Sequence, residues 1–264
     1  MAGNAQEWRE ETVRVAGTDL TLIQGGTGKP LLVLHEELGH PGWLRWHAAL
    51  AQNRTLLIPL HPGFGKSPRM EWVQGVRDLA GFYARVVRER GLSPVDVIGF
   101  SLGGWIAAEI AVKSTARLSH LVLANAVGIK VADRETRDVV DIFAITDVEF
   151  NDLAYFDPSV GRRDYGAMPD AEVMIAARNR EATGRFAWSP YMHNPKLKHR
   201  LARIRIPTLF LWGTNDRILS ETYGRAYCAA VPGARFEPIE RAGHFPHIEQ
   251  PEAFARRIAA FTER

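Results

Sequence analysis

The sequence VDVIGFSLGGWIAAEIAV, residues 95–112, contains the features that decide the fold. Residues 95–100 form a short, mostly apolar run of strand length, and residues 102–112 have the composition of a buried helix. Between them, G-F-S-L-G matches the pattern G-x-S-x-G, in which a serine sits on a sharp turn from strand to helix. The two glycines allow this turn, which predicts a strained Ser101 whose hydroxyl group is exposed above the sheet. The N-terminus of the helix favours negative charge at the same place.

Similar apolar runs recur along the chain and alternate with helical segments. The strand-like runs are residues 31–35, 55–60, 95–100, 121–126, 208–213 and 235–240. The helical segments are residues 43–52, 73–90, 102–112 and 221–231. Continuous apolar runs are typical of strands buried on both faces, so this order predicts an α/β fold with a doubly wound, mostly parallel sheet. Residues 12–26 have the pattern of an antiparallel hairpin at one edge.

The alternation of strands and helices is interrupted once, between residues 127 and 203. This stretch has helical segments separated by Pro, Asp, Trp and His, and it has no strand-like run. A structureless loop of this length is uncommon in a compact domain. We therefore expect a helical cap at residues 127–203, inserted into an α/β core formed by residues 1–126 and 204–264.

The composition indicates a soluble globular protein. Of 264 residues, 46% are hydrophobic and 24% are charged, and the formal net charge is only +3. Charges of both signs are interspersed, which argues against a nucleic-acid partner. No apolar run approaches the roughly 20 residues of a membrane span, and the N-terminal MAGNAQEWREE lacks the pattern of a signal peptide. The single cysteine, Cys228, excludes an intramolecular disulfide. We expect a cytoplasmic location, no cofactor and no metal ion.

Two further residues complete a set with Ser101. A serine hydroxyl is a weak nucleophile until a base removes its proton, and an acidic group must orient that base. Asp216 follows the strand-like run at residues 208–213, and His244 follows the last run. The order Ser101, Asp216, His244 is nucleophile, acid, base, as in enzymes with a G-x-S-x-G turn between strand and helix.

Other residues are alternatives for the base and the acid. His247 lies one turn beyond His244, next to the final helix, and is expected to be a packed or capping residue. Asp133, Asp138 and Asp141 follow the earlier strand and are alternative acids. They are expected to be solvated charges on helices of the inserted stretch.

With these motifs, the chain resembles an α/β hydrolase over nearly its whole length. The supporting matches are GFSLGGW (99–105), LHPGFGKS (60–67), LFLWGTNDRI (209–218) and RAGHFPHIEQPE (241–252). The resemblance implies an eight-stranded sheet, a helical cap over the active site, and acyl transfer to water through an acyl-enzyme. Two positions depart from the family pattern. The usual His-Gly after the third strand is His35-Glu36, and the acidic residue often found before the P-G-F-G turn is replaced around Leu60-His61.

The sequence HEELGH, residues 35–40, looks like a zinc-protease motif but does not match it. In H-E-x-x-H the two histidines are four residues apart, whereas here they are five apart. On a helix this spacing leaves the rings about 140° apart instead of about 40°. The segment also leaves a strand and runs into Gly39 and Pro41, so neither a helix nor a metal site is predicted.

The resemblance implies that HEELGH forms one wall of an oxyanion hole. A tetrahedral oxyanion needs two donors, usually backbone N–H groups. One is the N–H of Leu102, and the other comes from Glu36-Glu37, with Glu37 favoured as donor and Glu36 in the glycine position. Two carboxylates oppose a developing anion unless they face solvent or pair with a cation, and the sequence leaves both possibilities open. The candidate partners are Arg45, Arg178 and Arg185.

These features predict a serine hydrolase that cleaves a carboxylic ester or related acyl compound. The alternative is hydrolysis of a carbon–carbon bond in a β-diketone or dienoic acid, which resembling enzymes perform with the same triad. Phe245, where those enzymes commonly have tryptophan, and two glutamates in place of glycines disfavour it. A third possibility is a ligand-binding protein that performs no chemistry. The aromatic residues Trp105, Phe143, Phe150, Tyr155, Phe156, Trp188 and Tyr191 predict a small-molecule acyl substrate of hydrophobic character.

Overall fold

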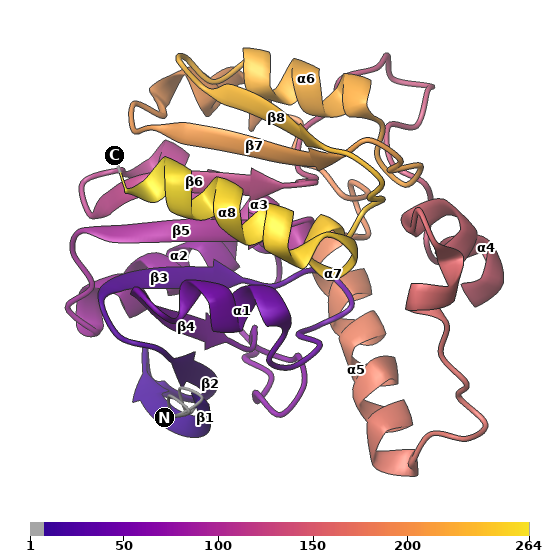
Figure 1. Ribbon diagram of the computed structural model, residues 1–264, viewed down its shortest axis with the longest axis horizontal. Coiled ribbons are helices and arrows are strands. Elements are labelled where there is room, and N and C mark those ends of the chain that lie inside the picture. The colour runs from indigo at the N-terminus through magenta and orange to yellow at the C-terminus, as the bar shows by residue number, and fades with distance from the viewer. Residues whose placement is uncertain (1–7, 264) are drawn as a thin grey trace.

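The chain folds around one β-sheet of eight strands, shown in Figure 1. The computed structural model describes residues 8–263, and the first seven residues of the N-terminal sequence considered above lie outside it. The strands are β1 (Trp8–Val15), β2 (Thr18–Gly25), β3 (Lys29–Leu34), β4 (Arg54–Pro59), β5 (Val95–Phe100), β6 (Leu118–Ala124), β7 (Thr208–Gly213) and β8 (Arg235–Ile239). Their order across the sheet is β1-β2-β4-β3-β5-β6-β7-β8.

The sheet is parallel except at one edge. Strands β3 to β8 pair in parallel, whereas β1 pairs with β2, and β2 with β4, in antiparallel fashion. The doubly wound, mostly parallel sheet and the edge hairpin predicted from the sequence are therefore confirmed. The strand order reverses at β3, which has β4 on one side and β5 on the other. The carboxyl ends of strands at such a reversal are where open α/β sheets bind ligands.

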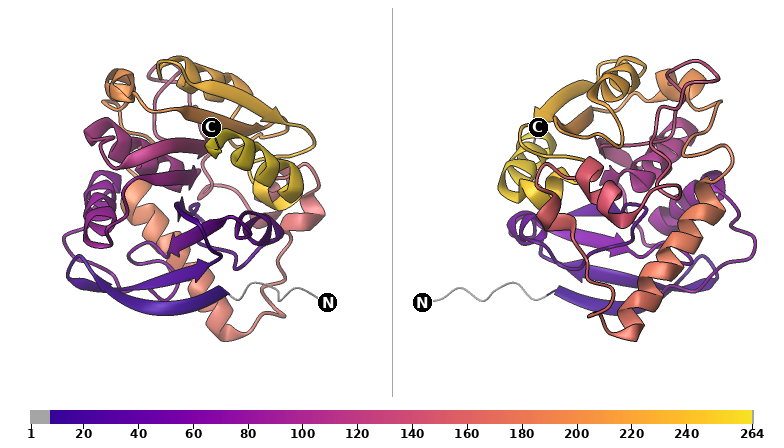
Figure 2. Two further views of the ribbon diagram at one scale, coloured as in Figure 1. Left: turned by 60° about the vertical axis from the view of Figure 1, so that its left-hand side comes forward. Right: turned by 90° about the vertical axis from the view of Figure 1, so that its right-hand side faces the viewer.

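Helices cover both faces of the sheet, so the core has two layers (Figures 1 and 2). One layer contains apolar side chains from α2 (Val76–Glu89), α3 (Leu102–Lys113) and α6 (Glu221–Ala229). The other layer contains side chains from α1 (Arg45–Leu50) and α8 (Pro251–Thr262). The continuous apolar runs become strands buried on both sides, as in β5. Within residues 8–263, no helix is both long enough and apolar enough to cross a membrane.

Residues 127–203 form a helical segment beside the sheet. It contains α4 (Asp147–Ala154), η1 (Pro158–Gly161), α5 (Asp170–Ala187) and η2 (Lys198–Arg203). Apart from two isolated bridges, from Gly128 to His193 and from Val139 to Leu219, this segment takes no part in strand pairing. Figure 1 shows α4 and α5 on the side where the parallel strands end. Its helices therefore lie over the edge that carries Ser101.

Candidate active site

The turn between β5 and α3 holds Ser101 at the carboxyl edge of the sheet. Ser101 has a φ of 43° and a ψ of −109°, which is costly for a residue with a side chain. A Cβ atom on Gly99 would collide with the carbonyl oxygen of Gly103, and a Cβ atom on Gly103 would collide with that of Leu34. The close packing of β5, α3 and β3 therefore requires glycine at both positions. We call residues 99–103 the elbow.

The Ser101 hydroxyl group is not exposed above the sheet, and this expectation from the sequence was wrong. Ser101 is 2% exposed. The helical segment is fastened over this edge: Ala154 accepts a hydrogen bond from the N–H of His244 at 2.6 Å, and Thr183 donates to the carbonyl oxygen of Glu37 at 2.6 Å. The G-x-S-x-G pattern describes only the turn, so it carries no information about what covers the serine.

Two side chains from distant parts of the sequence form a hydrogen-bond chain with Ser101. His244 lies between β8 and α7 (Pro246–Glu249), and its Nε2 is 3.0 Å from Oγ of Ser101. Its Nδ1 is 2.7 Å from Oδ2 of Asp216, which follows β7. Because Nδ1 faces a carboxylate, it holds the proton of the neutral ring and leaves Nε2 free to accept one. The three residues chosen from the sequence therefore form one continuous hydrogen-bond chain, with His244 in the middle.

Asp216 is fixed in one orientation by four hydrogen bonds. Its Oδ1 accepts from the N–H groups of Ile218 and Leu219, both at 2.9 Å. Its Oδ2 accepts from His244 and, at 2.6 Å, from Nδ2 of Asn125. Asn125 directly follows β6 and has no motif around it, so it was not predicted from the sequence. The only available signal was its position at a strand end next to β7, since parallel strands finish at one edge.

The carboxylates around His244 control its charge. Burial alone would lower the pKa of His244, but Asp216 raises it through charge and a hydrogen bond, and Glu37 and Glu36 raise it further. The resulting pKa is about 9. The imidazole is therefore mainly protonated at neutral pH, and its capacity to act as a base increases toward alkaline pH.

His247, the alternative base, is not part of this hydrogen-bond chain. Its ring packs against those of Phe100, Trp46 and Phe254, with centroids 4.2, 6.1 and 5.9 Å away. Its Nε2 lies 3.8 Å from Oε1 of Glu36. His247 therefore occupies the packed position that the sequence suggested, with an ion pair that the sequence did not indicate.

The alternative acids are engaged elsewhere. Asp133 accepts hydrogen bonds from the backbone of its own turn. Asp138 lies 3.2 Å from Lys130, and Asp141 lies 3.0 Å from Arg137. All three aspartates lie in turns and irregular backbone rather than on helices, which corrects the helical placement expected from the sequence.

Two backbone donors lie near the end of β3. Leu102 is the first residue of α3, so its N–H has no acceptor within the helix. Glu37 follows β3, and in the described part of the chain its N–H donates to no other backbone group. Gly103 packs against the carbonyl groups at the end of β3, which brings the start of α3 beside this turn. We call residues 35–39 the β3 turn.

The carboxylates of Glu36 and Glu37 are buried, which excludes the solvent-facing orientation left open by the sequence. Glu36 pairs with His247. Burial alone would raise the pKa of Glu36, but His247 holds it below its ordinary value. Glu37 points instead at the base: its Oε1 lies 3.7 Å from Nε2 of His244. Its Oε2 has no hydrogen-bond partner among residues 8–263.

None of the three candidate arginines contacts these carboxylates, so that part of the prediction was wrong. Arg45 extends toward the surface, 4.0 Å from Glu252. The two arginines of α5 donate to backbone carbonyl groups of the loop after β4. Their acceptors are Gly63 and Ser67 for Arg178, and Met70 and Val73 for Arg185.

Two stacked histidines hold the β3 turn in place. The rings of His35 and His61 are 3.7 Å apart. His61 donates its backbone N–H to Nε2 of His35 at 3.0 Å, and His35 donates from Nδ1 to the carbonyl oxygen of Glu36 at 2.8 Å. His61 also accepts at Nδ1 from the hydroxyl group of Tyr83, at 2.6 Å. Burial lowers the pKa of His35 to about 4 and that of His61 well below its ordinary value, so both rings are neutral.

Two pockets lie between the β3 turn and the helical segment. The larger has a volume of about 610 Å³, and its lining includes Glu36 and Phe245. The smaller has a volume of about 50 Å³. Both are also lined by Leu38, Tyr155 and Arg163. These pockets adjoin the residues next to His244 and Glu37, so they are candidate space for a substrate.

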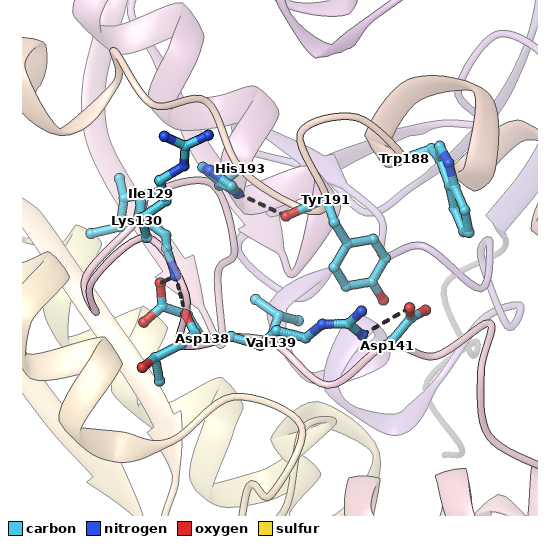
Figure 3. A pocket seen from close by; sticks show the side chains of 11 residues that line it. Ile129, Lys130, Asp138, Val139, Asp141, Trp188, Tyr191 and His193 are labelled. Atoms are coloured by element: carbon cyan, nitrogen blue, oxygen red, sulfur yellow. Dashed lines mark hydrogen bonds and ion pairs between the residues drawn. The ribbon is translucent and has the colours of Figure 1, made fainter.

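A third pocket, of about 340 Å³, is shown in Figure 3. Trp188 and Tyr191, two of the aromatic residues expected near the substrate, line it. Its acidic residues are paired with neighbouring cations, as the dashed lines show for Lys130 and Asp138. Ser101 and its hydrogen-bonded partners do not line this pocket, so we do not assign it to the active site.

The histidines and glutamates of HEELGH do not form a metal site. Across residues 8–263, no three histidine, cysteine, aspartate or glutamate side chains are arranged to hold a metal ion. Glu36 lies beside His247 and Glu37 lies beside His244 instead.

The fold and this site place the chain in a known family. The model of the alpha/beta hydrolase family matches residues 31–257, and the chain belongs to that family. It is a hydrolase of this family.

Several relatives cover almost the whole chain. The 2-hydroxymuconate semialdehyde hydrolase of Pseudomonas sp. strain CF600 is 27% identical, over 98% of this chain and 95% of its own length. The 2-hydroxy-6-oxononadienedioate/2-hydroxy-6-oxononatrienedioate hydrolase of Burkholderia vietnamiensis is 26% identical, over 94% and 93%. The 2-hydroxy-6-oxo-2,4-heptadienoate hydrolase of Pseudomonas putida is 24% identical, over 94% of each chain.

Solved structures agree on the fold. A bacterial membrane phospholipase A superposes with a TM-score of 0.78 at 22% identity, covering 97% of this chain and 86% of that structure. The 2-hydroxy-6-oxo-6-phenylhexa-2,4-dienoate hydrolase of Rhodococcus sp. strain RHA1 superposes with a TM-score of 0.77 at 17% identity, covering 98% and 100%. Enzymes named for different substrates thus share this architecture.

Proposed function

We propose that this protein is a serine hydrolase that cleaves a carbon–carbon bond beside a ketone, in a β-diketone or a dienoic acid. The hydrogen-bond chain from Ser101 through His244 to Asp216 carries the proposal, because it supplies a nucleophile, a base and an orienting acid. The names of the relatives support carbon–carbon cleavage over the ester hydrolysis that the sequence analysis preferred.

In the first step, Oγ of Ser101 attacks the ketone carbon and its proton passes to Nε2 of His244. The N–H groups of Leu102 and Glu37 bind the oxyanion. The carbon–carbon bond then breaks, and its electron pair moves to the leaving carbon, where the second carbonyl group delocalises the charge as an enolate. The imidazolium of His244 returns the proton to that carbon.

In the second step, water releases the acyl group. His244 removes a proton from the water molecule, which attacks the acyl carbon of the Ser101 ester. The tetrahedral intermediate collapses, Oγ takes up the proton from His244, and a carboxylic acid leaves. One water molecule is consumed and no oxidant or reductant is required. Asp216 holds the imidazole in the tautomer that both steps need.

In this proposal residues 127–203 act as a cap, and the larger pocket receives the part of the substrate remote from the ketone. Arg162 and Arg163 line that pocket, and within residues 8–263 neither forms an ion pair. Each is therefore free to bind the carboxylate of a dienoic acid. Asp164 and Glu172 also line the pocket and limit its positive charge.

The test compares two reactions with purified protein. The dienoate 2-hydroxy-6-oxo-6-phenylhexa-2,4-dienoate is followed by loss of its visible absorbance, and p-nitrophenyl butanoate by release of nitrophenolate. We expect a larger kcat/KM for the dienoate, and no turnover of either compound by Ser101→Ala. A dienoate that is not cleaved while the ester is cleaved contradicts the carbon–carbon assignment.

Ester hydrolysis is the second candidate, favoured by two observations. Phe245 stands where carbon–carbon hydrolases of the family commonly have tryptophan, and Glu36 and Glu37 replace the expected glycines. Ester cleavage uses the same residues, with the leaving alcohol taking the proton from His244. The same experiment separates the two reactions. If a fluorophosphonate fails to label Ser101 in folded protein, both candidates are wrong and a binding role remains.

A further inference from the structure

The Glu37 carboxylate is a buried acidic group to which the proposed mechanism assigns no contact with the substrate. Glu37 is 2% exposed. Throughout residues 8–263, neither of its carboxylate oxygens accepts a hydrogen bond, and its only ion-pair contact is His244 Nε2 at 3.7 Å. Burial of a charged group without hydrogen bonds is unfavourable. An acceptor left in this condition beside a nucleophile indicates a place for a ligand donor.

The other two buried glutamates in the described part of the chain, Glu36 and Glu109, have partners other than His244. Glu36, the neighbour of Glu37, has its pKa lowered by His247. Glu109, on α3, accepts a hydrogen bond from Asn194 and lies 3.9 Å from Arg200. Oε2 of Glu109 also lacks a hydrogen-bond partner, but it lies on α3 and does not contact His244. Glu37 differs from both glutamates in its position, because its carboxylate lies beside Nε2 of His244.

The backbone around Glu37 is fixed from the side of α5. Thr183 donates to the carbonyl oxygen of Glu37 at 2.6 Å, and Asn179 donates to that of Leu38 at 2.8 Å. The N–H of Gly39 closes the turn on Glu36 at 3.1 Å. These bonds fix the backbone from which the Glu37 carboxylate extends.

The carboxylate and the nucleophile face the same atom. Oγ of Ser101 lies 3.0 Å from Nε2 of His244, and Oε1 of Glu37 lies 3.7 Å from it. An acyl group bound to Ser101 therefore lies beside Glu37. The oxyanion that forms there is repelled by a free carboxylate. A substrate donor that hydrogen-bonds to the carboxylate reduces this repulsion and satisfies the buried oxygens.

We propose that Glu37 determines specificity by accepting a hydrogen bond from an O–H group that the substrate carries one or two carbons from the attacked carbonyl. The enol form of a β-diketone carries such a group. The inference rests on the proposed function, because it requires Ser101 to be the nucleophile. It assigns to the side chain of Glu37 a role separate from that of its backbone N–H.

Two esters that differ only in the donor test the inference without requiring carbon–carbon cleavage. p-Nitrophenyl 2-hydroxypropanoate and p-nitrophenyl 2-methylpropanoate have a hydroxyl and a methyl group at the same carbon. The measured quantity is the ratio of their kcat/KM values, divided by the ratio of their uncatalysed rates. We expect the wild-type protein to favour the hydroxy ester by about 10- to 100-fold.

Variants of one residue assign this preference. In Glu37→Leu the normalised ratio should fall to about one, and in Glu37→Gln, which is isosteric, to an intermediate value, since a neutral amide accepts a weaker hydrogen bond. Glu109→Gln removes a buried carboxylate from outside the site and should retain the wild-type ratio. Circular dichroism and thermal unfolding identify any variant that fails to fold. If Glu37→Leu does not fold, Glu37→Gln is the decisive variant.

The outcomes separate this inference from the proposed function. A normalised ratio near one in the wild-type protein, or a ratio unchanged in Glu37→Leu and Glu37→Gln, overturns the role of Glu37. Labelling of Ser101 by a fluorophosphonate in that case leaves the proposed function standing. Absence of both labelling and ester turnover overturns the proposed function and, with it, the inference.

Discussion

The elbow and the β3 turn lie side by side at the carboxyl edge of the sheet. Steric packing determines the conformation of the elbow, whereas buried polar contacts hold the β3 turn. In the elbow, only glycine fits at positions 99 and 103, because any side chain there would collide with a backbone carbonyl group. In the β3 turn, two glutamates occupy positions where the family commonly has glycine, and both are buried. The same active-site edge thus contains one segment that follows the family pattern and one that departs from it.

The difference follows from which atoms each segment contributes. The elbow contributes a side-chain oxygen, whose position depends on a strained backbone that only a few residues permit. The β3 turn contributes a backbone N–H, which any residue except proline supplies. Its side chains are therefore free to change, and here Glu36 binds His247 while Glu37 faces His244. Experiments on each segment test this division.

The largest effect is expected at the elbow. Ser101→Ala removes the nucleophile and should lower kcat by about 10⁴-fold or more, with the fold retained. Ser114→Ala, at the other end of α3, is the matched control and should keep full activity. Turnover of the dienoate or of an ester, followed by absorbance, provides the measurement. Activity retained in Ser101→Ala would show that the elbow does not carry the nucleophile.

A second change tests the packing of the elbow. Gly103→Ala places a Cβ atom against the carbonyl groups at the end of β3, and it should reduce the free energy of unfolding by about 3 kcal/mol. Gly75→Ala is the control, because a Cβ atom there meets no neighbour within 4 Å. Urea denaturation followed by circular dichroism gives both values. Equal stabilities for the two variants contradict the steric account.

The sequence predicted the parts of the fold that depend on local pattern. Continuous apolar runs indicated the parallel strands, and the spacing around Ser101 indicated the elbow. The same reasoning placed Asp216 and His244 after the correct strands, because the order of these elements along the chain is itself a signal. It also separated HEELGH from a zinc motif, since five residues of spacing do not put two histidines on one helical face.

The sequence did not predict contacts between segments that are far apart in the chain. Asn125 reaches Asp216 only because β6 and β7 are neighbours. Glu36 pairs with His247 rather than with an arginine, because α5 uses its arginines to hold a different loop. Such contacts depend on how the chain packs in three dimensions, and the sequence next to each of these residues contains no pattern that predicts them. The orientation of Glu37 was unpredictable for the same reason.

A smaller effect is expected at Asn125, which supports the acid from a neighbouring strand. Asn125→Gly removes the hydrogen bond to Asp216 and tolerates the φ of 42° found there. We expect kcat to fall about 10-fold while KM changes little, since one hydrogen bond to a charged group is lost. Steady-state kinetics measure both constants. A loss confined to KM would place Asn125 in substrate binding instead.

The smallest effect is expected in the pH dependence of kcat/KM when either glutamate of the β3 turn is replaced. His244 acts as a base only when Nε2 is unprotonated, and its pKa is about 9. The wild-type kcat/KM should therefore rise about tenfold per pH unit below pH 9 and level off above it. Glu37, Glu36 and Asp216 all raise this pKa, with Asp216 contributing most.

Removal of one carboxylate lowers the pKa of His244, so the acidic limb of the profile must move to lower pH. Glu37→Gln should shift it further than Glu36→Gln, because Glu37 lies beside Nε2 of His244 whereas Glu36 lies beside His247. Profiles of kcat/KM from about pH 6 to about pH 10 give both shifts. Equal shifts would contradict this difference in distance from Nε2 of His244. A larger shift for Glu37→Gln would show that the nearer carboxylate has the stronger effect on the charge of the base, so that within one turn the two neighbouring glutamates differ in function.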